Sequence, residues 1–179
     1  MQSIWSSKLI AEAATFAFHV HWDQVRQFNK EPYGKHLIEV ATSLHWAGCD
    51  EMTVAAGFLH DSNEDQDITF GELTRRFGAK VAQLVKEVTN VSQPSMGNRA
   101  FRKALDRDHV ARASPEGMSI KLADIQSNIR DVVQANRSFA RVYIPEKEEL
   151  LPLLSAGNPL LFEAAKYTVK RAKEALVRG

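Results

Sequence analysis

The sequence has almost no cysteine and lacks any long apolar run. Its one cysteine among 179 residues, Cys49, cannot form a disulfide within the chain, which suits a reducing compartment. No apolar run approaches the roughly 18 residues that a membrane span requires. The first apolar stretch has no basic region before it and is interrupted by Glu12, unlike a secretory signal. We therefore expect a cytoplasmic protein that does not enter membranes.

An excess of charge of either sign is also missing. Lys and Arg together number 23 and Asp and Glu number 22, which leaves a formal net charge of +1. Such a chain has no overall field to attract nucleic acid, so no nucleic-acid partner is expected. Hydrophobic residues at 44% and charged residues at 25% are typical of folded globular proteins and exclude disordered or collagen-like chains. The length predicts a single domain over residues 1–179.

Helical periodicity runs through almost the whole chain, and no segment alternates as a strand would. Residues 9–20, 37–44 and 81–88 place apolar side chains three and four positions apart. Thr69 with Glu72 predicts a capping box, while Ser114 and Asn158 each precede a proline that would begin a helix. These signals predict an all-α fold, a single-domain bundle of about eight to ten helices.

An unusual group of acids follows the short apolar segment that ends at Leu59. Residues 60–65, HDSNED, hold one imidazole and three carboxylates. On a helix, Glu64 lies four residues after His60, and Asp65 lies four after Asp61, so both acids would lean toward the His–Asp pair. Two carboxylates 4 Å apart repel by roughly 4 kcal/mol at an effective dielectric constant of about 20. A divalent cation would remove that cost, and a solvated acidic helix end is the alternative.

Two other segments carry polar residues in predicted helices. Asp124 and Asn128 share one face of a helix with apolar flanks, where a buried aspartate needs a partner. A structural hydrogen bond between the two is the alternative to a ligand site. His36 begins another helix, where the helix dipole disfavours the protonated ring and leaves a nitrogen available to a metal.

Taken in order, the segments EPYGKH, HDSNED and KLADIQSN resemble one family closely. It is the family of HD-domain metal-dependent phosphohydrolases of the RelA/SpoT type, the (p)ppGpp hydrolases, which include small single-domain alarmone hydrolases. The resemblance covers a core from about residue 13 to residue 131, and residues 138–179 would form helices that pack on it. It implies one divalent ion, usually Mn²⁺, held by His36, His60, Asp61 and Asp124.

The resemblance also implies roles for other residues. Glu64 and Asp65 match the acidic pair that positions and activates the attacking water, and Asn128 matches a residue near the nucleotide ribose or the metal-site water. Arg26 resembles an arginine beside the guanine base, although the spacing from Arg26 to the EPY motif is one residue longer than usual. Leu37 stands in place of a frequent proline. The metal positions are unaffected by these differences.

A polyphosphate substrate would need cations near such an acidic site. Four carboxylates and one divalent ion leave a charge of about −2 if all ionise. Arg99, Arg102 and Lys103 lie in a predicted helix and are candidates for substrate binding. A solvated helix face in which Arg102 pairs with Asp106 is the alternative.

The family's reaction removes pyrophosphate from the 3′ position of guanosine 3′,5′-bis(diphosphate) or its pentaphosphate relative, giving GDP or GTP. We expect that activity on a small nucleotide. The alternatives are the same scaffold acting on the 2′-phosphate of NADPH or on a nucleoside monophosphate, and a non-catalytic nucleotide sensor. We expect only packing from the apolar side chains between residues 139 and 179, including Val142, Tyr143 and Leu153. Association of copies into a homo-oligomer is left open.

Overall fold

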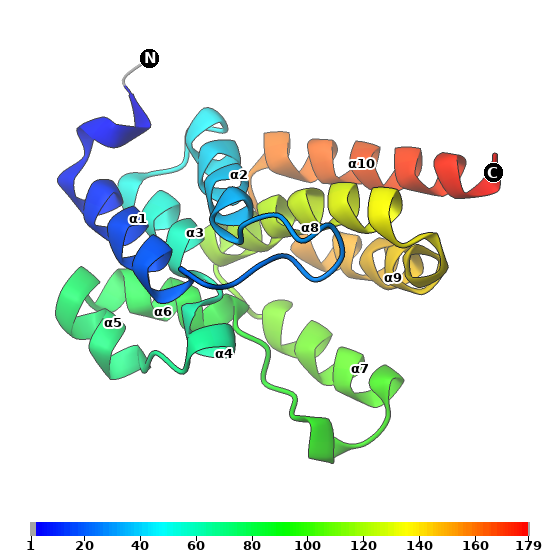
Figure 1. Ribbon diagram of the computed structural model, residues 1–179, viewed down its shortest axis with the longest axis horizontal. Helices are drawn as coiled ribbons and strands as arrows, with labels where there is room; N and C mark the ends of the chain where they lie inside the picture. The colour runs from blue at the N-terminus through cyan, green and yellow to red at the C-terminus, as the bar shows by residue number, and fades with distance from the viewer. Residues whose placement is uncertain (1–2, 179) are drawn as a thin grey trace.

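The computed structural model describes residues 3–178, and most of these residues are helical (Figure 1). The α-helices are α1 (Lys8–Val20), α2 (Gly34–Trp46), α3 (Glu51–Leu59), α4 (Ser62–Gln66), α5 (Phe70–Phe77), α6 (Ala79–Val88), α7 (Arg99–Val110), α8 (Pro115–Ala135), α9 (Arg137–Leu150) and α10 (Pro159–Val177). Short 3₁₀ turns lie at Ile4–Ser6, Pro94–Met96 and Leu151–Leu154. Within residues 3–178, the extended pairing is limited to an isolated bridge between Val25 and Pro32. The predicted all-α bundle is confirmed.

The residues predicted to cap helix N-termini form the expected hydrogen bonds with the backbone. Ser114 Oγ accepts a hydrogen bond from the backbone N–H of Gly117, and Asn158 Oδ1 accepts one from Leu160, each just before a proline. Thr69 Oγ1 likewise accepts from the backbone N–H of Glu72 at 3.1 Å. The predicted capping box is only half formed, because the Glu72 carboxylate accepts from Arg76 Nε at 2.9 Å.

Helix α8 is the centre of the bundle. It packs against α2, α3, α6, α9 and α10, and α10 lies along its length (Figure 1). Ile120, Leu122 and Ile125 are completely buried, and each such side chain contributes about 1.5–3 kcal/mol through removal from water. Since α8 is fixed on nearly all sides, its few polar residues are held in place by a rigid core.

Helix α3 is buried on every side, as its small apolar residues predict. Every residue from Thr53 to His60 is buried. Gly57 lies where the helix approaches α2, and a Cβ atom there would meet the Leu44 side chain. Because of this close packing, the end of α3, with His60 and Asp61, lies directly beside α2 and α8.

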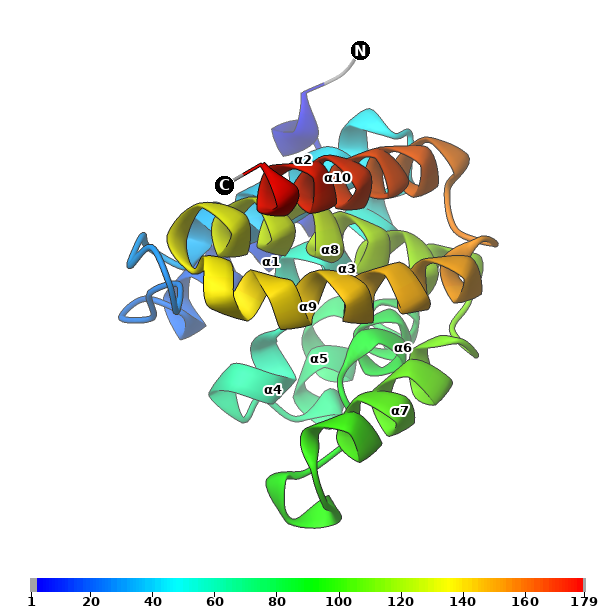
Figure 2. The same ribbon diagram turned by 90° about the vertical axis from the view of Figure 1, so that its right-hand side faces the viewer.

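The C-terminal part of the chain does more than the expected packing. Leu150 and Leu154 are buried, whereas Val142 and Leu153 are 50% and 40% exposed, so the packing role expected of these two was wrong. Helix α9 runs between α8 and α7 (Figure 2), and one of its faces borders an open cavity. Tyr143 lies on that face, so α9 forms part of the site.

Candidate metal centre

Three distant stretches of chain meet beside α8. His36 lies in the first turn of α2, His60 ends α3, and Asp124 lies midway along α8. All three side chains are buried, and Asp61, which follows His60, is half-buried. Because α2, α3 and α8 pack tightly against one another, these side chains share one small space.

The distances within this group suit a shared ion. His36 Nε2 and His60 Nε2 are 3.3 Å apart, and Asp61 Oδ2 is 3.4 Å from the first and 2.9 Å from the second. Asp124 Oδ1 lies 3.6 Å from His36 Nε2 and 3.9 Å from His60 Nε2. Ligand atoms that each lie roughly 2.0–2.2 Å from one ion are separated by about 3–4 Å. His36, His60 and Asp124 each place one ligand atom within 4.8 Å of the others, which suits a shared divalent cation, and Asp61 Oδ2 lies beside both imidazole nitrogens.

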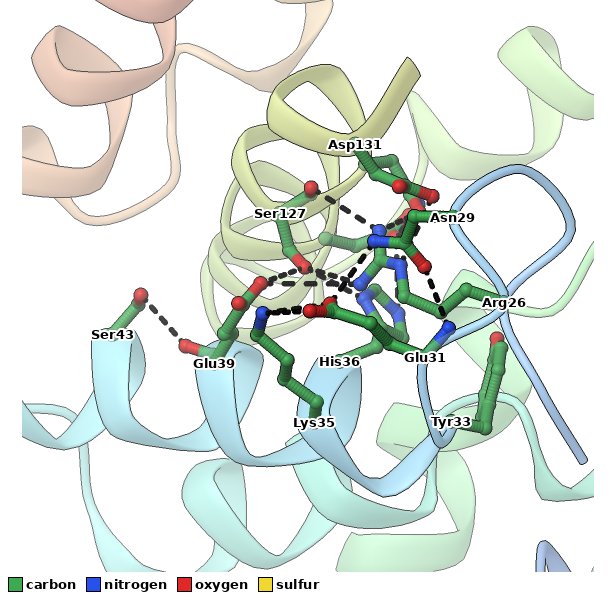
Figure 3. Close-up of polar contacts among 12 residues, drawn as sticks. Arg26, Asn29, Glu31, Tyr33, Lys35, His36, Glu39, Ser43, Ser127 and Asp131 are labelled. Carbon is green, nitrogen blue, oxygen red and sulfur yellow. Dashed lines mark hydrogen bonds and ion pairs between the residues drawn. The ribbon is translucent and has the colours of Figure 1, made fainter. Parts of the chain in front are cut away.

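Hydrogen bonds on the far side of each imidazole determine which nitrogen is free. His60 Nδ1 lies 2.9 Å from the Gly57 carbonyl oxygen, which can only accept, so Nδ1 carries the proton. His36 Nδ1 lies 2.8 Å from Ser127 Oγ, and that hydroxyl donates its own proton to Glu39 at 2.6 Å (Figure 3). His36 Nδ1 must then be a donor too. Both Nε2 lone pairs point into the space between the carboxylates, as in metal-ligating histidines with a fixed outer partner.

The charges around this space favour a cation within it. Burial lowers the pKa of His60, but Asp61 and Asp124 outweigh it and raise the pKa to about 9. Burial also raises the pKa of the Asp61 carboxyl, yet His60 and His36 hold it well below its usual range. The carboxylates therefore stabilise either a proton on His60 or a cation in its place. The residues present fit a divalent metal ion.

Each aspartate of the group has an outer partner. Tyr33 donates its hydroxyl proton to Asp61, and the Asn128 amide donates to Asp124. Lys121 Nζ lies 3.0 Å from the other oxygen of Asp124. Burial opposes the charge on Lys121, but Asp124 and Glu64 outweigh it and raise the pKa of the ammonium group. The sequence signal for Lys121 was its position three residues before Asp124 on one helix face; Tyr33 and Lys121 were not among the predicted site residues.

Glu64 and Asp65 lie in the first turn of α4, and both line the cavity beside the candidate metal centre. Glu64 accepts hydrogen bonds from the backbone N–H and the side-chain amide of Asn90, at 2.6 and 2.7 Å. Asp65 accepts from Gln24 Nε2 at 2.6 Å. Burial raises the pKa of Glu64, although the Lys121 charge opposes that effect. Both carboxylates are thus held in fixed positions at the cavity wall.

The cavity has a volume of about 530 Å³, well within the range of small-molecule sites. Asp61 and Asp124 form one part of its wall, whereas α7 and α9 supply Lys103, Arg107 and Lys147. An adjoining cavity of about 410 Å³ shares several of the same residues and extends to aromatic side chains. The residues common to both are Tyr33, Asp65, Lys103, Asn128 and Tyr143. The side formed by α7 and α9 also carries Asp106, Glu146 and Glu149, so cations and carboxylates are mixed there, opposite the aspartates.

Arg26 is 4% exposed, and its guanidinium group is occupied within the protein. It donates to Asp131 Oδ2 and Ser127 Oγ, both at 3.1 Å (Figure 3). It also donates to Asn128 Oδ1 at 3.3 Å. One edge of Arg26 still borders the adjoining cavity. The arginine therefore connects the loop before α2 to α8 at the site.

The other three basic residues differ in position. Lys103 lines both cavities. Arg99 borders the adjoining cavity, with Nε and Nη2 both 2.8 Å from the Glu146 carboxylate. Arg102 donates to the Gly97 carbonyl at 2.6 Å and lines neither cavity. Asp106 accepts from Ser92 rather than pairing with Arg102, so the alternative pairing is absent as well.

None of the helices in residues 3–178 has the length and apolar character that crossing a membrane requires.

Among known proteins, the chain is 34% identical over 171 residues to the Homo sapiens guanosine-3′,5′-bis(diphosphate) 3′-pyrophosphohydrolase MESH1, covering 90% of this chain and 93% of that protein. It is 38% identical over 128 residues to the Xenopus tropicalis protein of the same name, covering 69% of each.

A solved structure described as a metazoan ortholog of SpoT that hydrolyses ppGpp superposes with a TM-score of 0.83. The two chains are 28% identical, and the match covers 93% of this chain and 97% of the other. The family model of the HD domain matches residues 13–143, which include the four side chains of the candidate metal centre and reach into α9. The chain therefore belongs to the HD-domain family.

Proposed function

We propose that this protein is a metal-dependent phosphohydrolase that removes the 3′-pyrophosphate of guanosine 3′,5′-bis(diphosphate), giving GDP or, from the pentaphosphate, GTP. The observation that carries the proposal is that four side chains converge on one space: His36, His60, Asp61 and Asp124. In the tautomer with the proton on Nδ1, each imidazole has its Nε2 free to bind an ion. The relatives named for this reaction support the choice of substrate.

We assign Mn²⁺ as the ion. Two imidazoles and two carboxylates suit a hard to borderline divalent cation, and no thiolate is present among the proposed ligands to favour structural zinc. When bound, such an ion lowers the pKa of a coordinated water and neutralises a phosphoryl oxygen. Tyr33 and Asn128 would hold the two aspartates in orientation while the ion enters.

We assign Glu64 and Asp65 to the handling of the attacking water. A carboxylate within hydrogen-bond reach can take a proton from that water as the phosphorus–oxygen bond forms. Glu64 suits the role of base, because its raised pKa brings it closer to neutral pH. Asp65 would orient the water, and the Gln24 amide would keep its carboxylate from turning away.

Individual cations from α7 and α9 would offset the charge of the carboxylates toward an anionic substrate. Four carboxylates line or border the proposed reaction centre, and Lys121 already pairs with one of them. Lys103 and Arg107 approach from α7. Their charges would attract a polyphosphate that the carboxylates alone would repel.

A panel of nucleotides incubated with Mn²⁺ tests this function, with pyrophosphate and orthophosphate measured separately. The panel includes guanosine 3′,5′-bis(diphosphate), NADPH and nucleoside monophosphates. Pyrophosphate release from the first, lost after chelation and restored by Mn²⁺, is the expected result. Orthophosphate release from NADPH or a monophosphate, without pyrophosphate from the first compound, would assign another substrate. Turnover that survives chelation would contradict the metal mechanism.

We further propose that the enzyme works in the cytoplasm, which suits its single cysteine and a soluble nucleotide substrate. Fractionation of cells that produce the tagged full chain tests this location. Recovery in the membrane or secreted fraction would contradict it.

A further inference from the structure

Lys147 differs from the other cations of the 530 Å³ cavity. Lys121 Nζ lies 3.0 Å from Asp124, Lys103 Nζ lies 3.6 Å from Asp106, and Arg107 lies 2.7 Å from Glu149. These three cations have carboxylate partners, whereas the side-chain ammonium of Lys147 makes no hydrogen bond or ion pair with any residue between 3 and 178. Its described contact is with the Tyr143 ring, whose centroid is 4.6 Å from Nζ.

The surroundings of Lys147 make an unpaired ammonium costly. The side chain is half-buried in the last turn of α9. Burial lowers the pKa of Lys147 to about 8, and the charges of Lys121 and Lys103 act in the same direction against Asp124 and Glu146. A cation partly removed from water without a counter-ion destabilises the fold. An anion that entered the cavity would remove this cost.

The position of Lys147 indicates which anion fits. The proposed metal-binding aspartates line the side of the cavity formed by α4 and α8, while Lys147 and Arg107 line the side formed by α9 and α7, together with Glu146 and Glu149. A phosphate held at the ion would leave Lys147 for a different phosphate. The ammonium lies over the Tyr143 ring, which lines the same cavity.

We propose that Lys147 binds a second phosphate of the ligand, the one away from the ion, and so selects a pyrophosphoryl group over a single phosphate. Lys103 and Arg107 support this site from α7, although each already shares its charge with a carboxylate. The inference deepens the proposed function and rests on it for the identity of the substrate. The anion chemistry itself rests on the cavity and on the unpaired ammonium.

Calorimetric titration of the Mn²⁺-loaded protein with inorganic pyrophosphate and with orthophosphate tests this proposal. Lys147→Gln should weaken pyrophosphate binding about tenfold or more, as the loss of a charge-assisted hydrogen bond predicts. Orthophosphate binding should change by less than about threefold, because that ion would occupy the metal side. Lys147→Arg should restore most of the pyrophosphate affinity.

Lys166→Gln is the matched control, since Lys166 is exposed on α10 and pairs with Glu163 at 2.9 Å. It makes the same change in net charge and should leave both affinities unaltered. Equal pyrophosphate binding by Lys147→Gln and the unaltered protein would overturn the proposal. An equal loss for both anions would also overturn it, because general charge attraction would then explain the effect.

A melting curve separates this role from a purely structural one. Lys147→Met removes a half-buried unpaired charge, so its melting temperature should equal or exceed that of the unaltered protein while pyrophosphate binding weakens. A lower melting temperature with unchanged pyrophosphate affinity would assign a structural role and overturn the proposal. The titration involves no turnover, so its outcome is independent of the nucleotide panel. A negative result in the panel would contradict the proposed substrate, whereas a negative result in the titration would contradict only the proposed role of Lys147.

Discussion

The Nε2 atoms of His36 and His60 lie 3.3 Å apart, and in each ring the proton is used on the opposite nitrogen. Two lone pairs that face each other beside Asp61 and Asp124 repel unless a positive charge lies between them. This arrangement therefore lowers the free energy of unfolding unless a proton or a cation occupies the space between these atoms. Stability and metal binding should be linked at this point.

Mn²⁺ should raise the melting temperature of the protein. At free metal about 100 times above the dissociation constant, binding adds about 2.7 kcal/mol to the free energy of unfolding. For a chain of this size, that corresponds to about 5–10 °C. A thermal unfolding series with increasing Mn²⁺ measures the effect. His60→Ala should abolish it, while His19→Ala, at an exposed position on α1, should keep it; an equal shift in both variants would refute the linkage.

Replacing Glu64 with Gln, or Asp65 with Asn, should reduce kcat by about 10²–10⁴-fold, the usual contribution of a positioned general acid or base. The metal content should not change, because neither residue belongs to the four proposed ligands. Kinetics and metal analysis of the same samples check both statements. Glu163→Gln, on the exposed surface of α10, should behave as the unaltered protein. Full activity in both site variants would remove their assigned role.

Arg26→Ala should destabilise the protein by about 3–5 kcal/mol, because it leaves the buried Asp131 carboxylate without its partner. Denaturant unfolding measures this loss. Arg171→Ala removes an exposed pair with Glu174 and should cost about 0–1 kcal/mol. If Arg26→Ala kept its stability and lost only nucleotide affinity, the predicted contact of this arginine with the base would be its main role.

The value of kcat/KM should fall as the pH rises through about 8, where Lys147 loses its charge in the free enzyme. The groups that face it are Lys103, Lys121, Asp124 and Glu146. Lys147→Arg should extend activity to higher pH, since a guanidinium stays charged there. A pH profile of kcat/KM for both proteins measures the difference. If kcat/KM falls at the same pH in both, a group other than Lys147 causes the fall.

The same group should affect stability in the opposite direction. Its pKa is about 8 in the folded chain and 10.5 ordinarily, so between these values the unfolded chain binds more protons. Lys147 therefore makes the free energy of unfolding increase with pH in that window, while it makes kcat/KM decrease. Lys147→Met should flatten the stability change between pH 8 and 10.5, relative to the unaltered protein, in denaturant unfolding measurements; an unchanged slope would contradict the assignment.

The fold was predictable because its signals are local. Apolar spacing along a helix reports its buried stripe, and Ser114 or Asn158 before proline fixes where a helix begins. The spacing of Asp124 and Asn128 likewise placed both on one helix face, and the hydrogen bond between them, the alternative to a ligand site, is present. In each case the interacting groups lie within about one turn of each other.

The contribution of α9 could not be predicted from such signals. Tyr143 and Lys147 enter the cavity because α9 packs against α8, and that packing depends on contacts between residues far apart in the sequence. A lysine in an amphipathic helix usually lies in solvent, and nothing near Lys147 in the sequence distinguishes it. Arg26 was predicted to contact the ligand, but its main partner in the folded chain is Asp131. That pairing could not be predicted, because the two residues are 105 positions apart in the sequence.

The most direct test of the account is the metal content of the purified, Mn²⁺-reconstituted protein, measured by elemental analysis after removal of free ions. We predict one ion per chain in the unaltered protein and a large loss in Asp61→Asn and in Asp124→Asn, with Asp23→Asn, an exposed control, retaining the ion. Full occupancy in both site variants, or none in the unaltered protein, would show that these side chains do not hold a metal together.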